Sequence, residues 1–494
     1  MPVLSAALAA MTMFTPAPKA EPCSPALAGT SAEIALQHAR EATGLKEMNG
    51  RVLHLETADA EVQDFQSDRT YAPFLSLYVL RDVWFDPATG AEQVSGKTLF
   101  VGSTSSAPSW VSTAGDVFMR RGATLLAVPQ MARYTEPRRL LDVAAVLHDW
   151  SASGGARVVG LCEARDFPRL TLSRQTAHGE ERLYLDPESF LPVVLRRTEP
   201  HYLWGDEAVE YVYSNWMRVD GASVAMTSFR VVDGAPEFSR TVTRAALLPA
   251  DSAPAFAPPP VAPHPTTAPP SGSPAPRVDT VRVAPNAFLL VNRAYTSAVA
   301  LARDTVFVLD ATMSEPRARQ DSAWIGTLFP GQHPLVVVVT DLAWPHVAGV
   351  RFWVANGATI VSHRTSRDFL QRVVERRWTL EPDLLEQRRA RAPFRFRAVE
   401  EGLDLAGGAL QLRTIGGIGS EGALMAFLPA SGFLWAGDFV QDTKAPTAYA
   451  LEVYAATRHA GFQPSSVAAM HIPLTPWDGL EEVLAPAATG GEKR

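Results

Sequence analysis

The chain has 494 residues, of which 47% are hydrophobic, and 45 Lys and Arg residues against 52 Asp and Glu residues give a net charge of -7. Single hydrophobic cores stop growing at roughly 250 to 300 residues, so we expect two domains. The acidic balance, without a long basic run, excludes the electrostatic footprint that nucleic-acid binding requires.

Cysteine usage restricts the kinds of metal site that the chain can build. Cys23 and Cys162 are the only cysteines and lie far apart in the sequence. The sequence therefore predicts neither a zinc-finger spacing nor a disulfide framework. A metal site in this chain has to use histidine and carboxylate ligands.

The N-terminus, "MPVLSAALAAMTMFTPAPKA", holds an apolar run too short for the roughly 20 residues that span a bilayer. One interpretation is a signal peptide over residues 1–28, cleaved at Ala26-Leu27-Ala28, with export to the periplasm. Cleavage there leaves Cys162 as a lone thiol, which we expect to be buried. A basic segment before the apolar run is missing, so the alternative is a cytoplasmic protein with an N-terminal tail. No later stretch predicts a transmembrane helix.

A helix is predicted at the start of a first domain, which we expect over residues 30–248. Thr30 and Glu33 have the spacing of a capping box, and Gly44 offers a C-terminal stop. The apolar residues that share one face of this helix are Ala32, Ala35, Leu36 and Ala39. Their periodicity indicates that this face packs on a core.

The rest of this domain has the pattern of strands. Segments such as "FLSLYVLRDVWFD", "RLYLDPESFLPVVLRR" and "EYVYSNWMRVDGASVAMTSF" are rich in Val, Leu, Tyr and Trp and are divided by Asp-Pro and Asp-Gly turns. In the second, residues 186–189 suit a hairpin turn. A large antiparallel sheet curved over the helix is the economical interpretation.

Such strand, Asp-Pro turn, strand units resemble the curved half-barrels of bacterial periplasmic lipoprotein carriers. The resemblance implies an acyl chain held in the concave face of the sheet. The alternative is a scaffold domain with an ordinary packed face.

A linker and a second domain follow. Residues 249–277 are dominated by Pro, Ala, Ser and Thr, which favour extended conformations over a packed core. After them, strands and helices alternate over residues 278–485, including the buried strand "HPLVVVVT". We expect an αβ/βα sandwich whose active edge lies where strands end. Ser366 is expected to cap a helix, and His363 to form hydrogen bonds at its entry rather than bind a metal.

The second domain resembles the metallo-β-lactamase fold family. The resemblance is carried by "VDTVRVAPNAFLLVN", "VVTDLAWPHVAGVRFWVANGATIVSH", "GIGSEGALMAFLP", "GFLWAGDFV" and "MHIPLTPWDGL", in this order. It implies an α+β chain in which an N-terminal antiparallel β-rich domain precedes a C-terminal metallo-β-lactamase sandwich.

Most metal ligands of that family are replaced in this chain. Where the family has H-x-H-x-D-H after the apolar strand, the corresponding positions hold Asp341, Ala343, Pro345 and His346. A further family histidine is replaced by Gly419.

Three ligand positions are kept, at His346, Asp438 and His471. The resemblance thus implies at most one zinc ion, whose bound water would attack an ester, amide or lactone of a small-molecule substrate. Asp341 would be a substitute ligand or the general base, the alternative being a solvated carboxylate that caps the following helix.

The opposite hypothesis is an inactive relative that binds an apolar ligand or a partner in the cell envelope. Pro345 shapes the loop differently from one that turns an aspartate onto a metal, and Trp344 brings apolar surface to the site. Ser420 and Glu421, in a Gly-rich loop, are further candidate ligand contacts.

Overall fold

The computed structural model describes residues 23–25, 30–45, 48, 50–63, 75–100, 103–113, 116–121, 124–128, 132–253, 277–292, 295–417, 420 and 422–490. The chain divides into two compact units. The first comprises Met1–Glu61, Leu77–Thr198 and Glu207–Val261, and the second Val62–Ser76, Glu199–Asp206 and Ala262–Arg494. Residues 26–28 and 254–276, which hold the predicted cleavage site and most of the predicted linker, lie outside the described residues.

The first unit is built on one large sheet. Its strands are β1 (Cys23–Ser24), β2 (Arg51–Gln63), β3 (Leu75–Phe85), β4 (Glu92–Phe100), β5 (Ser103–Ser106), β6 (Trp110–Thr113), β7 (Asp116–Arg121), β8 (Thr124–Ala127), β9 (Arg157–Ala164), β10 (Phe167–Thr176), β11 (Gly179–Leu185), β12 (Pro192–His201), β13 (Gly205–Val219), β14 (Ala222–Val232) and β15 (Ala235–Pro249). Its helices are α1 (Ala32–Thr43), α2 (Ala132–Arg139) and α3 (Val143–Ser153).

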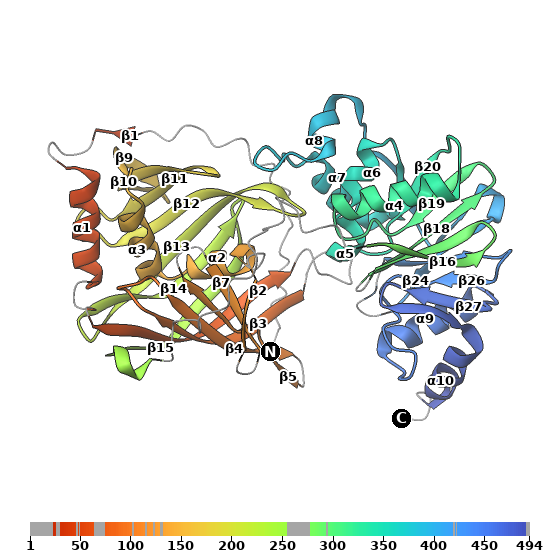
Figure 1. The fold of residues 1–494 in the computed structure, drawn as a ribbon, viewed down its shortest axis with the longest axis horizontal. Helices are drawn as coiled ribbons and strands as arrows, with labels where there is room; N and C mark the ends of the chain where they lie inside the picture. The colour runs from red at the N-terminus through yellow and green to blue at the C-terminus, as the bar shows by residue number, and fades with distance from the viewer. Residues whose placement is uncertain are drawn as a thin grey trace, which may run out of the picture. The chain divides into compact units, whose positions relative to one another are not determined.

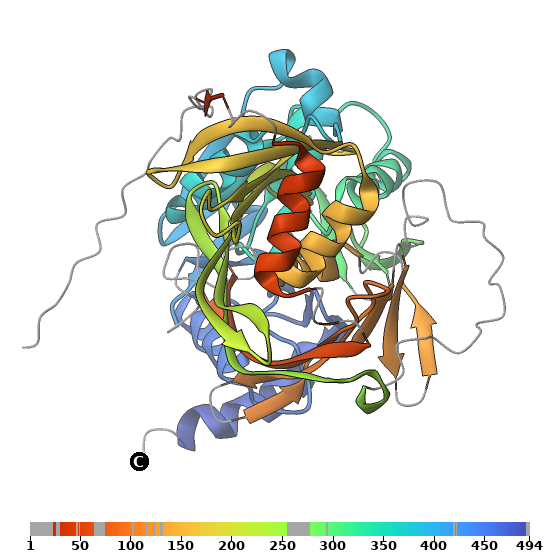
Figure 2. The same ribbon diagram turned by 90° about the vertical axis from the view of Figure 1, so that its left-hand side faces the viewer.

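The strand order is β1-β9-β10-β11-β12-β13-β14-β15-β2-β3-β4-β6-β7-β8, with β5 paired to β4. The pairs β13/β14 and β15/β2 are antiparallel, as the sequence pattern predicts for a β-rich N-terminal part. Figure 2 shows the sheet curving around α1 and α3. The core lies inside this curve, where Leu36, Leu147 and Trp150 of the helices pack with strand residues. The predicted hairpin turn is also present, since Asp186 Oδ1 accepts a hydrogen bond from Ser189 N at 3.0 Å.

Helix α1 is the predicted first helix, but its cap differs from the prediction. Ser31 is the N-cap, and its hydroxyl accepts a hydrogen bond from Ile34 N at 3.2 Å. The prediction of Thr30 as the cap is wrong by one residue, because the first helical turn begins at Ala32. Gly44 ends the helix with a φ of 71° in the left-handed region, as expected.

A disulfide joins Cys23 to Cys162, so the prediction that the cysteines stay unpaired is wrong. Strand β1 pairs antiparallel with β9 and sets Cys23 directly opposite Cys162. The sequence separation of 139 residues gives no sign of this register. Cys162 is buried, as expected, but it is half of a disulfide rather than a lone thiol.

The second unit contains two sheets. The first is β16 (Asp279–Ala284), β17 (Ala287–Val291), β18 (Thr296–Ala302), β19 (Thr305–Leu309), β20 (Leu335–Val338), β21 (Thr359–His363) and β22 (Arg395–Val399), in that spatial order. The second is β23 (Gly402–Leu405), β24 (Leu410–Ile415), β25 (Ala423–Leu428), β26 (Phe433–Trp435), β27 (Ser466–Ala469) and β28 (Ile472–Pro476), also in spatial order. The helices are α4 (Glu315–Leu328), α5 (Trp344–Val347), α6 (Val350–Ala355), α7 (Arg367–Glu375), α8 (Leu384–Arg388), α9 (Ala448–His459) and α10 (Trp477–Gly490).

These elements form four layers. Phe307 and Val338 of the first sheet pack against Leu424 and Trp435 of the second. Helices α4, α6 and α7 cover the other face of the first sheet, and α9 and α10 cover the other face of the second (Figure 1). Each layer thus buries the apolar face of its neighbour, and a large buried side chain contributes about 1.5 to 3 kcal/mol.

The residues just before α7 test two predictions, one for His363 and one for Ser366. His363 Nδ1 accepts a hydrogen bond from Thr365 N at 3.4 Å and lies 2.7 Å from Thr365 Oγ1, so His363 is a helix-entry residue as predicted. Ser366 lies at the predicted N-cap position of α7, but its hydroxyl makes no capping bond. A short 3-10 turn over Arg364–Ser366 precedes α7 and takes the place of that cap.

Candidate functional site

The candidate site lies at one edge of the two sheets in the second unit. Strands β19 and β20 are parallel, so the residues that follow them, Asp310 and Asp341, meet at the same edge. Asp438 follows β26, and His471 lies between β27 and β28.

Asp310 is the centre of a buried hydrogen-bond network at this edge. It is fully buried, and its Oδ1 accepts hydrogen bonds from the backbone N and the hydroxyl of Thr340, both at 2.9 Å. Its Oδ2 accepts one from Trp435 Nε1 at 2.8 Å and lies 3.1 Å from His346 Nδ1. The network holds the loop after β20 against β26.

Sequence reasoning missed Asp310. The available signal was its position directly after the buried strand "TVFVL", where a polar residue at a strand end points to a site edge. Its φ of 70° in the left-handed region was not visible in the sequence. Aspartate is one of the few residues that adopt this conformation at modest cost.

His346 is fully buried between two carboxylates. Its Nδ1 faces Asp310, and its Nε2 lies 3.4 Å from Asp341 Oδ2. Asp341 is also buried, and its Oδ1 accepts a hydrogen bond from Ala343 N at 2.8 Å. Asp341 therefore makes a local turn bond just before α5, but it is not the solvated carboxylate of the alternative prediction.

The pKa values in this cluster reflect burial and mutual charge. Burial alone would lower the pKa of His346, but the carboxylates of Asp341, Asp310 and Asp438 raise it to about 10. Burial, with repulsion from Asp310 and Asp438, raises the pKa of Asp341 to about 8. The two titrations are coupled, and the pair retains a proton at neutral pH. A histidine binds a metal in its neutral form, so a metal bound to His346 would have to displace this proton.

Asp438 and His471 form a second pair, with Asp438 Oδ1 3.2 Å from His471 Nε2. Their side chains keep 15% and 34% of their surface exposed. Among the described residues, no three His, Cys, Asp or Glu side chains are arranged so that they could hold one metal ion. The donor set that the family resemblance implies, His346, Asp438 and His471, is thus split into two ion pairs and does not fit a zinc ion as placed.

Gly437 lets the loop that carries Asp438 approach the buried network. Its φ is 59°, in the left-handed region that favours glycine. A Cβ at this position would lie 2.7 Å from Thr340 Oγ1. Any other residue would push the loop away from Thr340 and Asp310.

Aromatic side chains surround the exposed part of the site. The half-buried Trp344, first residue of α5, lies 5.6 Å from the ring of Tyr295, and Tyr295 lies 5.2 Å from the ring of His471. Tyr202, from the segment Glu199–Asp206 of the same unit, adds a ring 5.7 Å from Trp344. Burial and the nearby Asp438 carboxylate raise the pKa of Tyr295.

The two other predicted ligand contacts do not lie on this surface as described. Ser420 is fully buried, and its hydroxyl donates to Glu452 Oε2 of α9 at 2.5 Å. Glu421 lies outside the described residues.

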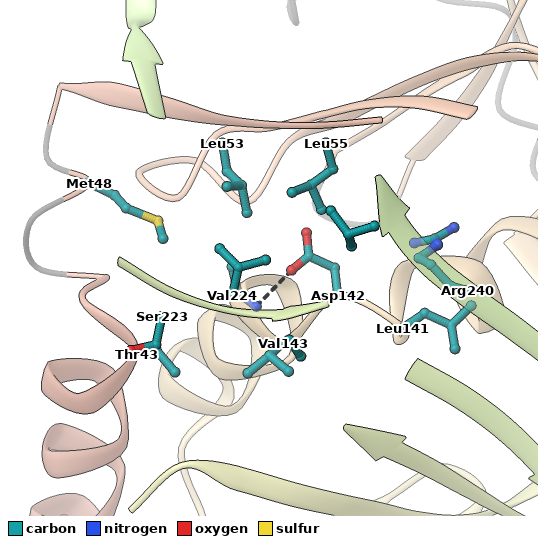
Figure 3. Close-up of a pocket in the computed structure, with 13 residues that line it drawn as sticks. Thr43, Met48, Leu53, Leu55, Leu141, Asp142, Val143, Ser223, Val224 and Arg240 are labelled. Carbon is teal, nitrogen blue, oxygen red and sulfur yellow. Dashed lines mark hydrogen bonds between the residues drawn. The ribbon is translucent and has the colours of Figure 1, made fainter. Parts of the chain in front are cut away.

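The interior of the first unit offers a second candidate site. A cavity of about 20 Å³ lies beside α3 and the inner face of the sheet, and Figure 3 shows Leu53, Leu55 and Val224 around it with the Asp142 carboxylate. A cavity of this volume holds about one water molecule, and an acyl chain needs far more space. In the described residues this cavity is thus too small for the ligand that the lipoprotein-carrier resemblance implies.

Charged residues are buried in the same unit, and two of them, Asp142 and Arg240, line this cavity. Asp59 accepts hydrogen bonds from Arg81 Nε at 2.9 Å and Arg240 Nε at 3.1 Å. Glu92 is 2% exposed, and burial raises its pKa to about 7 although Arg139 and Arg240 oppose the shift. The interior of this unit is therefore a polar network as well as an apolar core.

Comparisons with known proteins give a likeness to metallo-β-lactamases. No protein-family model matches the sequence, and no curated protein matches it. The metallo-β-lactamase DIM-1 is 15% identical, with a TM-score of 0.35, over 44% of this chain and 99% of that one. A metallo-β-lactamase from Erythrobacter litoralis is 16% identical, with a TM-score of 0.34, over 43% and 96%. FIM-1 from Pseudomonas aeruginosa, solved in a mono-zinc form, is 12% identical, with a TM-score of 0.33, over 44% and 97%.

In the described ranges, no helix is long and apolar enough to cross a membrane.

Proposed function

We propose that this chain is a divergent metallo-β-lactamase-fold protein that binds a ligand at the former metal edge instead of hydrolysing a substrate with zinc. The proposal joins the order of the sequence motifs over residues 278–485 with the geometry of the site that they build.

The observation that carries the proposal is the position of His346. Its ring has no exposed surface, and each of its nitrogens faces a carboxylate, Asp310 on one side and Asp341 on the other. A zinc ligand needs a nitrogen lone pair directed at the ion. A zinc ion at Nε2, which makes no hydrogen bond, would compete for this nitrogen with the Asp341 carboxylate 3.4 Å away.

A location in the cell envelope is part of the proposal. Disulfides form and persist in oxidising compartments and are rare in the cytosol. The bond between Cys23 and Cys162 supports export of the chain on this ground, but only in a form that keeps Cys23 and is not cleaved at Ala26-Leu27-Ala28.

A mononuclear zinc hydrolase acting on an ester, amide or lactone is the second candidate. It is favoured by one observation, that Asp438 and His471 are side by side and partly exposed. Two ligands are one fewer than the three that catalytic zinc sites use.

The two candidates are separated by the zinc content of the purified protein. The full chain is incubated with zinc, desalted and analysed, beside the double variant His346→Ala, His471→Ala and the control His459→Ala. We expect no more than about 0.1 zinc per chain in all three, and no ester turnover that a chelator abolishes. About one zinc per chain in the wild type and the control, lost in the double variant, would overturn the proposal in favour of the hydrolase.

A further inference from the structure

The partly exposed side chains of the site form a continuous row that the proposed function leaves unassigned. Trp344, Tyr295 and His471 follow one another with ring centroids 5.6 and 5.2 Å apart. The row ends at Asp438, whose Oδ1 is 3.2 Å from His471 Nε2. These residues come from four places: the residue before β18, helix α5, the loop after β26 and the loop after β27.

The charges at this edge favour one sign of ligand. Asp310 and Asp341 are both buried against His346, so neither carboxylate lies on the exposed row. Asp438 keeps 15% of its side chain exposed beside the aromatic row. An anionic ligand placed on the row would meet this carboxylate and be repelled, whereas a cation would be attracted.

The aromatic rings of this row also favour a cation. The face of an indole or phenol ring attracts a cation within about 6 Å, and it does so best for weakly hydrated cations such as alkylammonium groups. The rings of Trp344 and Tyr295 meet edge to face at an interplanar angle of 70°, and a cation would contact the parts of these half-buried rings that stay exposed.

We propose that Trp344, Tyr295 and Asp438 bind an organic cation, an alkylammonium or quaternary ammonium group, at the edge where a metallo-β-lactamase would hold zinc. This inference rests on the proposed function, because a protein that binds a ligand without zinc needs another source of affinity at this edge. Carboxylate attraction and contact with ring faces supply it together.

The test compares two probes of the same shape. Choline and 3,3-dimethylbutan-1-ol differ in that a quaternary nitrogen replaces a carbon, so their affinities differ through the charge. Binding to the full, oxidised chain is measured by calorimetry and by tryptophan fluorescence. We expect choline to bind at least about tenfold more tightly than the alcohol, since charge and ring faces together contribute about 1 to 2 kcal/mol.

Variants locate the binding. Trp344→Leu and Asp438→Asn should each weaken choline binding by about tenfold or more. The controls Phe394→Leu and Asp404→Asn change a half-buried ring and an exposed carboxylate elsewhere in the same unit and should keep the wild-type affinity. Thermal melts of every variant identify any that fail to fold, and Asp438→Glu, which keeps the charge, should retain more affinity than Asp438→Asn.

Equal affinity for the two probes, absence of choline binding, or wild-type affinity in both Trp344→Leu and Asp438→Asn would overturn the inference. The zinc measurement keeps the two proposals distinct. A zinc-free chain that does not bind choline contradicts this inference alone, whereas a chain that holds one zinc contradicts the proposed function.

Discussion

His346 and Glu92 are buried ionisable residues whose surroundings act on them in opposite ways. Around His346, two carboxylates stabilise the charged ring, so burial does not neutralise it. Around Glu92, burial outweighs the nearby arginines, and the pKa of the carboxyl rises to about 7. The charged form of Glu92 is therefore a source of instability near neutral pH.

Glu92 should make the stability of the chain depend on pH. Its pKa is about 7 in the folded chain against 4.5 for the free group, so folding takes up a proton between these values. The free energy of unfolding should therefore fall as the pH rises from about 4.5 to 7. Glu92→Gln should remove this dependence and stabilise the chain at pH 8 by about 1 to 3 kcal/mol, as measured by urea unfolding.

The matched control is Glu188→Gln, at an exposed turn position. It should leave both the stability and its pH dependence within about 0.5 kcal/mol of the wild type. A Glu92→Gln variant with the pH dependence of the wild type would show that Glu92 is ionised in the folded chain.

The motif pattern located part of the site in the sequence. Asp341, His346, Asp438 and His471 could be named because their residue types and order follow a known ligand pattern. What the sequence could not supply was Asp310, which turns His346 from a candidate ligand into one member of a buried ion cluster. Asp310 lies 36 positions before His346, and only the parallel pairing of β19 and β20 brings the two together.

At the scale of elements, the N-terminus of α1 shows how a cap depends on one residue. Ser31→Ala should destabilise the first unit by about 1 kcal/mol, because the hydroxyl that accepts from Ile34 N is lost. Thr30→Ala, one position earlier, should have no effect above about 0.5 kcal/mol. Urea unfolding followed by circular dichroism measures both, and equal losses would contradict the assignment of Ser31 as the cap.

The loop after β26 depends on Gly437. Gly437→Ala should cost about 2 to 4 kcal/mol, since it combines a left-handed φ with a Cβ 2.7 Å from Thr340 Oγ1. Gly461→Ala is the matched control, because its φ of 67° is similar and nothing lies within 4 Å of its added Cβ. It should lose only the conformational part, about 1 kcal/mol. Equal losses in the two variants would mean that Thr340 yields to the new methyl group.

Helix α1 could be predicted because its apolar residues recur with helical periodicity. Its first residue could not, because a cap depends on where the first hydrogen-bonded turn starts. Thr30 and Ser31 are both good capping residues. The same ambiguity explains Ser366, which precedes a helix by position but has no capping bond since a 3-10 turn takes its place.

At the scale of the whole molecule, the Cys23–Cys162 disulfide is the main stabilising feature that the sequence did not indicate. Its loop of 139 residues is long, so reduction should destabilise the first unit by about 2 to 5 kcal/mol. Urea unfolding with and without dithiothreitol measures this, and Cys162→Ser should give the same result without the reductant. A disulfide-linked peptide found by mass spectrometry under non-reducing conditions confirms the pairing, and two free thiols would contradict it.

Three sheets, a curved one in the first unit and a packed pair in the second, account for the β-rich character of the described residues. The sequence predicted these sheets because a strand buried on one face alternates apolar and polar residues, and a strand buried on both faces is apolar throughout. No sequence pattern indicated how many strands join one sheet or that β1 pairs with β9. A strand of two residues, Cys23–Ser24, is too short to show any period.

This short strand has a consequence for how the oxidised chain is made. Cys23 emerges first from a ribosome or a translocation channel and has no intramolecular partner until residue 162 has followed it. The two cysteines of this sequence can form one bond with each other. A wrong disulfide between cysteines of this sequence therefore has to join two copies of the chain. When many copies are made at once, the expected side product is therefore a dimer joined by a disulfide between two chains.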